Sequence, residues 1–367
     1  MTWNWQLKDW PNYIYQIKDI EAFERLLLKE AGVFLGVFQC LDAQGQEQMK
    51  IELLSDEALN TSAIEGEYLN RESLQASLKR AFGLTAEKRH ITPAEKGVAQ
   101  MMLEVYRDYA APLSADVLFS WHKLLMSGRS ELEMIGGYRT HAEPMLIVSG
   151  GTREPIIHFE APPSKHVKTL MKDYIQWFNE SSPNGKKPLL ALERAAIAHI
   201  YFESIHPFED GNGRIGRALA EKALSQCLGY PSLIALSTVM EQNKKSYYAA
   251  LQTTNHGLDI SSWMNYFSET ALKAQEHSKV QIEFLIHKAK FFDKFDSKLN
   301  DRQRKVLLRM FKEGVAGFEG GLSADKYINI TRTSRSTATR DLQELLEMGA
   351  LTKQGDLRYS RYFLKMN

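Results

Sequence analysis

The sequence predicts an all-α protein in which strands are confined to two short stretches. Apolar residues recur at helical spacing over much of the chain, for example at Leu192, Ala196 and Ile200 in an alanine-rich segment. Strand-like apolar runs around turn residues occur at 146–159 and at 350–364. These observations indicate a packed helical core with a small β-hairpin and a second, C-terminal hairpin.

Length and composition are those of a globular chain with two or three domains. The 367 residues contain 44% hydrophobic side chains, and the formal charge of +1 gives no global preference for nucleic acid or membranes. Cys40 and Cys227 are too few for a disulfide framework or a zinc cluster. The first residues lack a signal-like pattern, and no apolar stretch reaches membrane length. We therefore expect a cytoplasmic protein without a membrane partner.

Periodicity and composition divide the chain into four parts. Residues 1–95 are expected to form an N-terminal helical segment, 96–275 a helical core, 276–300 a linker helix and 301–367 a small C-terminal domain. The individual helices that apolar spacing indicates in the first two parts are 20–29, 51–62, 170–178 and 217–228.

The twelve residues from His206 to Arg217 concentrate more chemistry than any other stretch. Gly211 and Gly213 allow successive backbone N–H groups to converge on one point, which suits an oxyanion or a phosphate. The residues that follow read as a helix, so its first turn presents unpaired N–H groups and its positive dipole end to the same anion.

Side chains of this segment supply further parts for chemistry on a polyphosphate. Arg214 and Arg217 share a helix face and can bind neighbouring phosphates. Asp210 offers a hard oxygen ligand where a magnesium ion bridging the phosphates would sit. His206 can accept a proton near neutral pH. Together they indicate a reaction on a nucleotide polyphosphate.

The segment resembles the Fic motif, His-x-Phe-x-(Asp/Glu)-Gly-Asn-Gly-Arg-x-x-Arg, and matches it at every fixed position. Fic proteins are mostly helical enzymes that transfer AMP from ATP to a hydroxyl side chain (Ser, Thr or Tyr) of a protein. The resemblance implies that His206 deprotonates the target hydroxyl, that Asp210 holds Mg²⁺ and that Arg217 binds the γ-phosphate. The residues that it assigns to the ATP site are Phe208, Glu209, Asp210, Gly211, Asn212, Gly213, Arg214 and Arg217.

Two simpler interpretations of the glycine-rich segment explain less. Residues 211–216 also fit G-x-G-x-x-G, but the dinucleotide fold needs a preceding strand, and the preceding residues look helical. A plain glycine turn between two helices accounts for the glycines and leaves Asp210, Asn212 and both arginines unexplained. We therefore reject the first and disfavour the second.

A second motif runs from Thr61 to Gly66. It resembles (Ser/Thr)-x-x-x-Glu-(Gly/Asn), which many Fic proteins carry on a helix against the active site. The resemblance implies an inhibitory element of Thr61, Glu65 and Gly66, in which Glu65 occupies the guanidinium of Arg217 that the γ-phosphate needs. Without the family, Ser62 and Glu65 form a capping box at a helix start.

Two further assignments follow from a looser likeness. The hairpin at 146–159, around a diglycine at 150–151, corresponds to the Fic flap, along which an extended stretch of the target protein would bind by strand addition. An ordinary hairpin that shields the core is the alternative. Tyr247, Tyr248 and Asn255 stand where family members border the adenine, although Tyr247 also fits an apolar helix face.

The C-terminal part, 301–367, differs in charge, with 13 Lys and Arg against 8 Asp and Glu, a balance of +5. Helices are expected at 301–311, 323–328 and 334–348, and strands at 350–353 and 357–364. This order resembles a winged helix-turn-helix domain, which would bind DNA or serve protein contacts and dimerisation. The candidates for DNA contacts, at the start of the third helix, are Ser334, Arg335, Ser336, Thr337 and Arg340.

Three functions remain open on these grounds. We favour a protein adenylyltransferase that uses ATP and Mg²⁺ and is autoinhibited by Glu65. The alternatives are a DNA-binding regulator whose Fic core senses a nucleotide, and an enzyme that removes AMP with Glu65 positioning water. The oligomeric state is not fixed by the sequence, and a homodimer is one possibility.

Overall fold

The structure is a computed structural model that describes residues 2–149 and 156–366. It divides into two compact units, which are treated separately below. The first unit is Met1–Gly36 with Lys50–Ser278, and the second is Val37–Met49 with Lys279–Asn367.

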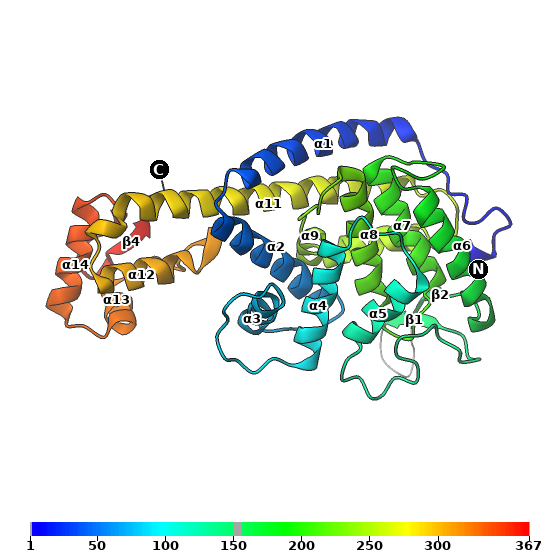
Figure 1. Cartoon of the computed structure of the whole chain (residues 1–367), viewed down its shortest axis with the longest axis horizontal. Helices are drawn as coiled ribbons and strands as arrows, with labels where there is room; N and C mark the ends of the chain where they lie inside the picture. Colours follow the sequence, from blue (N-terminus) through cyan, green and yellow to red (C-terminus); the bar gives the residue numbers. More distant parts are fainter. Residues whose placement is uncertain (1, 150–155, 367) are drawn as a thin grey trace. The chain divides into compact units, whose positions relative to one another are not determined.

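The first unit is built around one pair of central helices (Figure 1). Helices α7 (Ala191–Ile205) and α8 (Asn212–Leu228) pack against each other, and α4, α5, α6 and α9 contact one or the other of them. Both central helices are buried along most of their length. Alanine-rich sequence makes this possible, because small side chains leave room for neighbours on several sides. The buried pair gives the loop between them a rigid base.

The other elements of this unit surround the pair. Their bounds are η1 Asn4–Gln6, α1 Ile17–Gln39, α2 Ala43–Ile64, α3 Arg71–Ala81, α4 Pro93–Arg107, α5 Ala115–Leu125, β1 Leu146–Ser149, β2 Ile156–Glu160, α6 Ser164–Glu180, α9 Leu236–Gln242, α10 Lys244–Thr253 and α11 Ser261–Phe295, of which α1, α2 and α11 continue into the second unit. In the part of the chain that the structure describes, no helix combines the length and apolarity needed to cross a bilayer.

Helix ends in the N-terminal part follow local capping chemistry. Thr92 begins α4 with a reciprocal box, in which its hydroxyl accepts from Glu95 N at 3.2 Å and Glu95 accepts from Thr92 N at 2.8 Å. The capping box suggested for Ser62 and Glu65 is wrong, because α2 ends at Ile64 and both residues lie at its C-terminal end. Glu65 is therefore available for contacts outside its own helix.

Strands β1 and β2 form the predicted hairpin in antiparallel register, with Leu146 opposite Glu160 and a bulge between Ile147 and Val148. The diglycine at 150–151 lies outside the described residues. Apolar side chains remain exposed on both strands, among them Val148 and Ile156. The hairpin thus presents apolar surface away from the core.

Glu57 of α2 and Glu221 of α8 are among the buried carboxylates of the first unit. Glu57 accepts hydrogen bonds from the backbone N–H of Ser237 at 2.8 Å and from its hydroxyl. Glu221 Oε1 accepts from the Ser232 hydroxyl at 3.0 Å, whereas its Oε2 has no partner among the described residues. Burial raises the pKa of Glu57 to about 6, and burial together with the charge of Glu57 raises the pKa of Glu221 well above its ordinary value.

We expect Glu221→Gln to stabilise the protein at alkaline pH. A raised folded-state pKa means that the favourable contribution of protonated Glu221 is complete at low pH and is lost as pH rises through that pKa. Glutamine keeps the acceptor for Ser232 and cannot ionise. The gain in Tm should therefore grow between about pH 5 and pH 8, to about 2–4 °C.

Thermal melts at both pH values measure this gain. The exposed Glu269 of α11, which pairs with Lys273, provides the matched control Glu269→Gln. An equal gain for Glu221→Gln at both pH values would contradict the prediction.

The second unit has the element order predicted for the C-terminal domain. Its elements are η2 Asp296–Lys298, α12 Asp301–Phe311, η3 Gly314–Ala316, α13 Ala324–Thr331, α14 Arg335–Glu347, β3 Leu351–Gln354, η4 Leu357–Tyr359 and β4 Arg361–Leu364, with β3 antiparallel to β4. Buried Asp341 of α14 accepts hydrogen bonds from Arg302 at 2.8 and 3.0 Å and from the Tyr327 hydroxyl at 2.8 Å. One carboxylate therefore ties the three helices together.

The linker helix expected at 276–300 is not a separate element. Helix α11 runs unbroken from Ser261 to Phe295, so the predicted boundary after residue 275 falls inside it.

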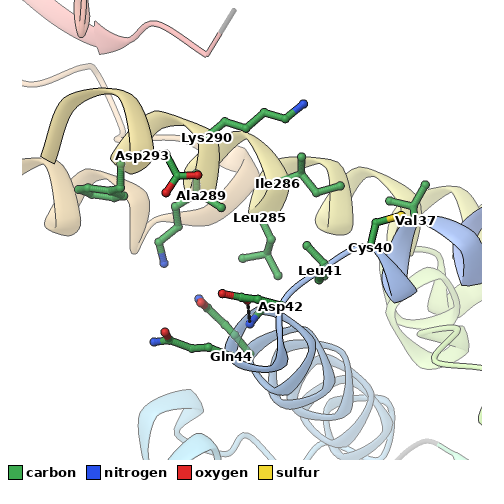
Figure 2. Close-up of a pocket in the computed structure, with 14 residues that line it drawn as sticks. Val37, Cys40, Leu41, Asp42, Gln44, Leu285, Ile286, Ala289, Lys290 and Asp293 are labelled. Atoms are coloured by element: carbon green, nitrogen blue, oxygen red, sulfur yellow. Dashed lines mark hydrogen bonds between the residues drawn. The ribbon is translucent and has the colours of Figure 1, made fainter.

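A cavity of about 630 Å³ lies between this helix and the segment from Val37 to Gln48 (Figure 2). It belongs to the second unit, whereas all residues of the predicted ATP site belong to the first.

Candidate active site

The predicted phosphate loop connects α7 to α8. His206 ends α7 in the left-handed region, at φ 49° and ψ 60°, and its N–H donates to Phe202 O at 3.0 Å. Gly211 begins α8 at φ 84°. A non-glycine residue with positive φ costs roughly 1–3 kcal/mol and persists only where neighbours hold it.

Arg139 holds the backbone at this point. Its Nε donates to His206 O at 2.8 Å, its backbone N–H donates to Pro207 O at 2.9 Å, and Nη2 donates to Pro162 O at 2.5 Å. Burial of the guanidinium lowers the pKa of Arg139 to about 10, which leaves it charged at neutral pH. Arg139 could not be predicted from the sequence, because no local signal connects it with a loop more than sixty residues away.

Phe208 and Asn212 lock the loop from the inside. Phe208 is fully buried and stacks on His122, with ring centroids 4.2 Å apart. Its backbone N–H donates to Asn212 Oδ1 at 3.0 Å, and Asn212 Nδ2 donates back to Phe208 O at 2.8 Å. His122 Nδ1 accepts from Gly136 N at 2.9 Å, so Nε2 carries the proton that is donated to Asp210 O at 3.2 Å. Burial lowers the pKa of His122 to about 4, which keeps it neutral.

The Asp210 carboxylate lies between two guanidinium groups. Its Oδ2 is 3.0 Å from Arg129 Nη1, and its Oδ1 is 3.5 Å from Arg214 Nη2 and accepts from Gly211 N at 2.5 Å. The side chain is 35% exposed and can reach a ligand. The described residues contain no cluster of three or more His, Cys, Asp or Glu that could hold a metal. Mg²⁺ commonly binds through one or two carboxylates and substrate phosphates, which a single Asp210 fits.

Glu209 contacts the chain outside the motif. Its Oε2 accepts a hydrogen bond from Glu133 N at 3.0 Å, in the segment that follows α5. This hydrogen bond ties the loop between α7 and α8 to that segment, so the Glu209 side chain supports the loop.

Arg217 is buried, and most of its hydrogen bonds go to residues at the end of α2. Its Nε donates to Thr61 Oγ1 at 2.8 Å, and Nη2 donates to Thr61 O at 2.9 Å and to Glu65 Oε1 at 2.7 Å. Nη1 donates to the Tyr247 hydroxyl at 3.3 Å. Burial opposes the charge, but Glu65 and Tyr247 outweigh it and raise the pKa of Arg217. The guanidinium is therefore charged and shared among three side chains.

Glu65 also covers the start of α8. A Cβ at Gly213 would collide with Glu65 Oε1, so only glycine permits this approach of the carboxylate. The first turn of a helix is an anion-binding position, because its N–H groups are unpaired and the dipole is positive there. Glu65 Oε1 thus lies against the first turn of α8.

Glu67 makes a second, unpredicted ion pair with the motif. Its Oε2 is 2.7 Å from Arg214 Nη1, and the Arg214 side chain is only 4% exposed. Gly66, at φ 83°, allows the chain to turn between the two acidic residues. As a result Glu65 and Glu67 contact Arg217 and Arg214 respectively, the two arginines assigned to phosphate.

The three adenine candidates occupy different environments. Tyr247 is 1% exposed, and its hydroxyl lies between Arg217 and His199 Nε2, 2.9 Å from the latter. Asn255 Nδ2 donates to His158 O at 3.0 Å and so ties β2 to the core. Tyr248 keeps an exposed ring and donates its hydroxyl to Ile64 O at 3.2 Å. Of the two tyrosines, only Tyr248 has a ring that an adenine base could reach in this conformation.

Comparison with known proteins identifies the part of the chain that carries this site. Residues 112–224 match the Fic/DOC family, a range that includes the whole segment from His206 to Arg217. The chain contains a Fic/DOC domain. Residues 3–84 match a second family, described as a domain of unknown function (DUF4172), and this match includes the Thr61–Gly66 motif.

Named relatives of the Fic domain are similar over part of their length. Protein adenylyltransferase fic-1 of Caenorhabditis elegans is 27% identical over 210 residues, which cover 56% of this chain and 36% of that protein. Protein adenylyltransferase Fic of Drosophila mojavensis is 29% identical over 155 residues, which cover 41% and 28%. These matches span only 36% and 28% of the length of the curated relatives.

Solved Fic structures share the fold. A Fic family protein from Desulfovibrio desulfuricans G20 matches with a TM-score of 0.53 at 21% identity, over 97% of this chain and 98% of that chain. A Fic domain containing signaling protein from Bacteroides thetaiotaomicron VPI-5482 matches with a TM-score of 0.51 at 20% identity, over 69% and 96%. The predicted helical Fic fold is confirmed.

The DNA-contact candidates lie in the second unit, outside the Fic domain. Arg335 and Arg340 are exposed on α14, and Arg335 donates to Asp325 of α13. Ser334 caps α14 by accepting from Thr337 N at 3.3 Å, and its hydroxyl is 3.0 Å from that of Ser336. The capping residues are therefore engaged locally, and the two arginines project from the helix surface.

Proposed function

We propose that this protein transfers AMP from ATP to a hydroxyl side chain of a protein. The observation that carries the proposal is the joining of His206 to the anion-binding start of α8 by one rigid loop, with Arg214 and Arg217 on that helix. The Fic/DOC match and the names of the curated relatives support the same activity.

The residues have separate roles in this reaction. His206 takes the proton of the target hydroxyl, whose oxygen attacks the α-phosphorus of ATP as the bond to the departing pyrophosphate breaks. Backbone N–H groups at the start of α8 and the two arginines bind the phosphate oxygens. Because the Asn212 side chain bridges the loop, its contribution to phosphate binding is through its backbone N–H.

Asp210 would hold a magnesium ion at this site. Its carboxylate is partly exposed and stands at the start of α8, beside the expected phosphates. The ion, when bound, would neutralise phosphate charge. In the present conformation Arg129 and Arg214 form ion pairs with this carboxylate.

We also propose that the end of α2 inhibits the enzyme. Glu65 occupies Arg217 and the anion position over Gly213, and Glu67 occupies Arg214. A triphosphate bound productively needs the same guanidinium groups. Thr61 adds two acceptors for Arg217 and Gly66 provides the turn, so the whole motif acts as one clamp.

The hairpin is the proposed binding site of the target protein. Asn255 and Trp5 bond to the carbonyls of His158 and Glu160, so β2 is the anchored strand. Strand β1 then forms the outer edge on which an extended segment could pair. Exposed Val148 and neighbouring apolar side chains suit such a partner.

We propose Tyr248 as the ring that borders the adenine.

Label transfer tests the proposed activity directly. The Glu65→Gly variant is incubated with lysate, Mg²⁺ and ATP labelled at the α-phosphate. We expect covalent label in protein from this nucleotide and none from γ-labelled ATP, because pyrophosphate leaves. Label from the γ-position would indicate phosphoryl transfer instead. Loss of existing label on prolonged incubation with wild-type protein would favour AMP removal.

A second candidate function concerns the second unit. Exposed Arg335 and Arg340 on α14, in a unit with a winged-helix element order, favour DNA binding. Gel-shift titration of the full chain with mixed genomic fragments, at two salt concentrations, tests this proposal. Retention of affinity in Arg335→Ala/Arg340→Ala would exclude the α14 surface.

A further inference from the structure

A carboxylate that the motif does not include faces the catalytic imidazole. Glu203 lies in the last turn of α7, three residues before His206, and its Oε2 is 3.6 Å from His206 Nδ1. His206 ends α7 in the left-handed conformation, so the chain reverses direction next to Glu203. The two side chains are 17% and 14% exposed, so little water competes for the contact.

The other oxygen of Glu203 faces inward. Glu203 Oε1 is buried and has no hydrogen-bond partner among the described residues. A Cβ placed on Gly216 would lie 2.8 Å from this oxygen and 3.1 Å from His199 Nδ1, so both groups lie against the same face of α8. Gly216 therefore provides the space in which the carboxylate is seated.

His199 Nδ1 lies beside Gly216, on the same face of α8 as the carboxylate. The Tyr247 hydroxyl accepts from Arg217 and so donates to His199 Nε2, which leaves the imidazole proton on Nδ1. Burial opposes the charge of Glu203, but the imidazoles of His206 and His199 and the charged guanidinium of Arg217 outweigh it and hold the pKa of Glu203 below the ordinary value. Glu203 is thus an ionised carboxylate with one oxygen toward His206 and the other buried against α8.

We propose that Glu203 is a positioning residue for AMP transfer, which accepts the Nδ1 proton of His206 and thereby leaves Nε2 free to take the proton of the target hydroxyl. The proposal rests on the function proposed above. The hydroxyl proton moves to Nε2, the oxygen forms its bond to the α-phosphorus, and pyrophosphate leaves with the electron pair of the broken bond. His206 keeps its Nδ1 proton throughout, and Glu203 stabilises the imidazolium.

The contact in the present structure is longer than a hydrogen bond. Contacts of this kind commonly shorten when substrate binds and the site closes. Hydrogen bonds link Glu65 through Arg217 and Tyr247 to His199, whose Nδ1 has no hydrogen-bond partner among the described residues. The carboxylate acts on the imidazole and touches no part of the nucleotide.

Kinetics in the Glu65→Gly background test the proposal. We expect Glu203→Gln to lower kcat about tenfold and Glu203→Ala about 100-fold, with KM for ATP within about twofold of the parent. Gly216→Ala, whose Cβ would displace the carboxylate, should resemble Glu203→Gln. The matched control is Glu269→Gln on the exposed face of α11. Unchanged kcat in Glu203→Ala, or a loss confined to KM, would overturn the proposal.

Imidazole ¹⁵N chemical shifts give a readout that needs no turnover. In the Glu65→Gly parent we expect His206 to carry its neutral-state proton on Nδ1, and Glu203→Ala to move it to Nε2. The same tautomer in both proteins would overturn the positioning role. If the parent transfers no AMP, the proposed function fails, and the tautomer measurement still decides the relation between Glu203 and His206.

Discussion

Glu65→Gly is expected to raise AMP transfer about 100-fold. Arg217 donates to three acceptors at the C-terminal end of α2, of which only the Glu65 carboxylate is charged, and this carboxylate also lies against Gly213. A factor of 100 corresponds to about 2.7 kcal/mol. Breaking a fully buried ion pair costs about 3–5 kcal/mol, and the 30% exposure of Glu65 reduces that figure. One carboxylate is therefore sufficient to hold most molecules inactive.

Initial rates of label transfer from α-labelled ATP measure the effect. Glu67→Gln provides a graded comparison, because Glu67 holds Arg214 and leaves the Glu65 contact intact. We expect about tenfold activation from Glu67→Gln alone. Equal rates for wild type and Glu65→Gly would remove the inhibitory proposal.

Local sequence is sufficient where one segment contains its own partners. The helix predicted at 301–311 from apolar spacing has these bounds in the structure, where Asn300 caps its start. The phosphate loop could be identified in the same way, since its glycines, its acid and its arginines lie within twelve residues. The hairpin strands follow from two short apolar runs on either side of turn residues.

Contacts between distant segments could not be predicted from one sequence. Arg139 reaches the carbonyl of His206, and Glu67 reaches Arg214, across long stretches of chain with no shared motif. Tyr247 fitted both an adenine contact and an apolar helix face, and only its 1% exposure shows that the ring is packed. The capping box failed because the same residue pattern occurs at a helix end, where side chains point to other helices.

His206→Ala in the Glu65→Gly background is expected to lower AMP transfer at least about 10³-fold. A positioned general base contributes about 10²–10⁴ to the rate, and no other imidazole can replace it. His122 hydrogen-bonds to Gly136 and Asp210 O through its ring nitrogens, and His199 is fully buried. Nucleotide binding should persist, because the α8 start and both arginines are unchanged.

The backbone at His206 determines which second variant makes this result decisive. At φ 49° alanine is strained, so loss of activity in His206→Ala could come from a displaced loop. Asparagine tolerates the left-handed region and cannot accept the hydroxyl proton at neutral pH. We therefore expect His206→Asn to keep the Tm and ATP affinity of the parent and to be equally inactive. The exposed His166 on α6 provides the control His166→Ala, which should retain full activity. Activity in His206→Asn near that of the parent would show that another group takes the proton.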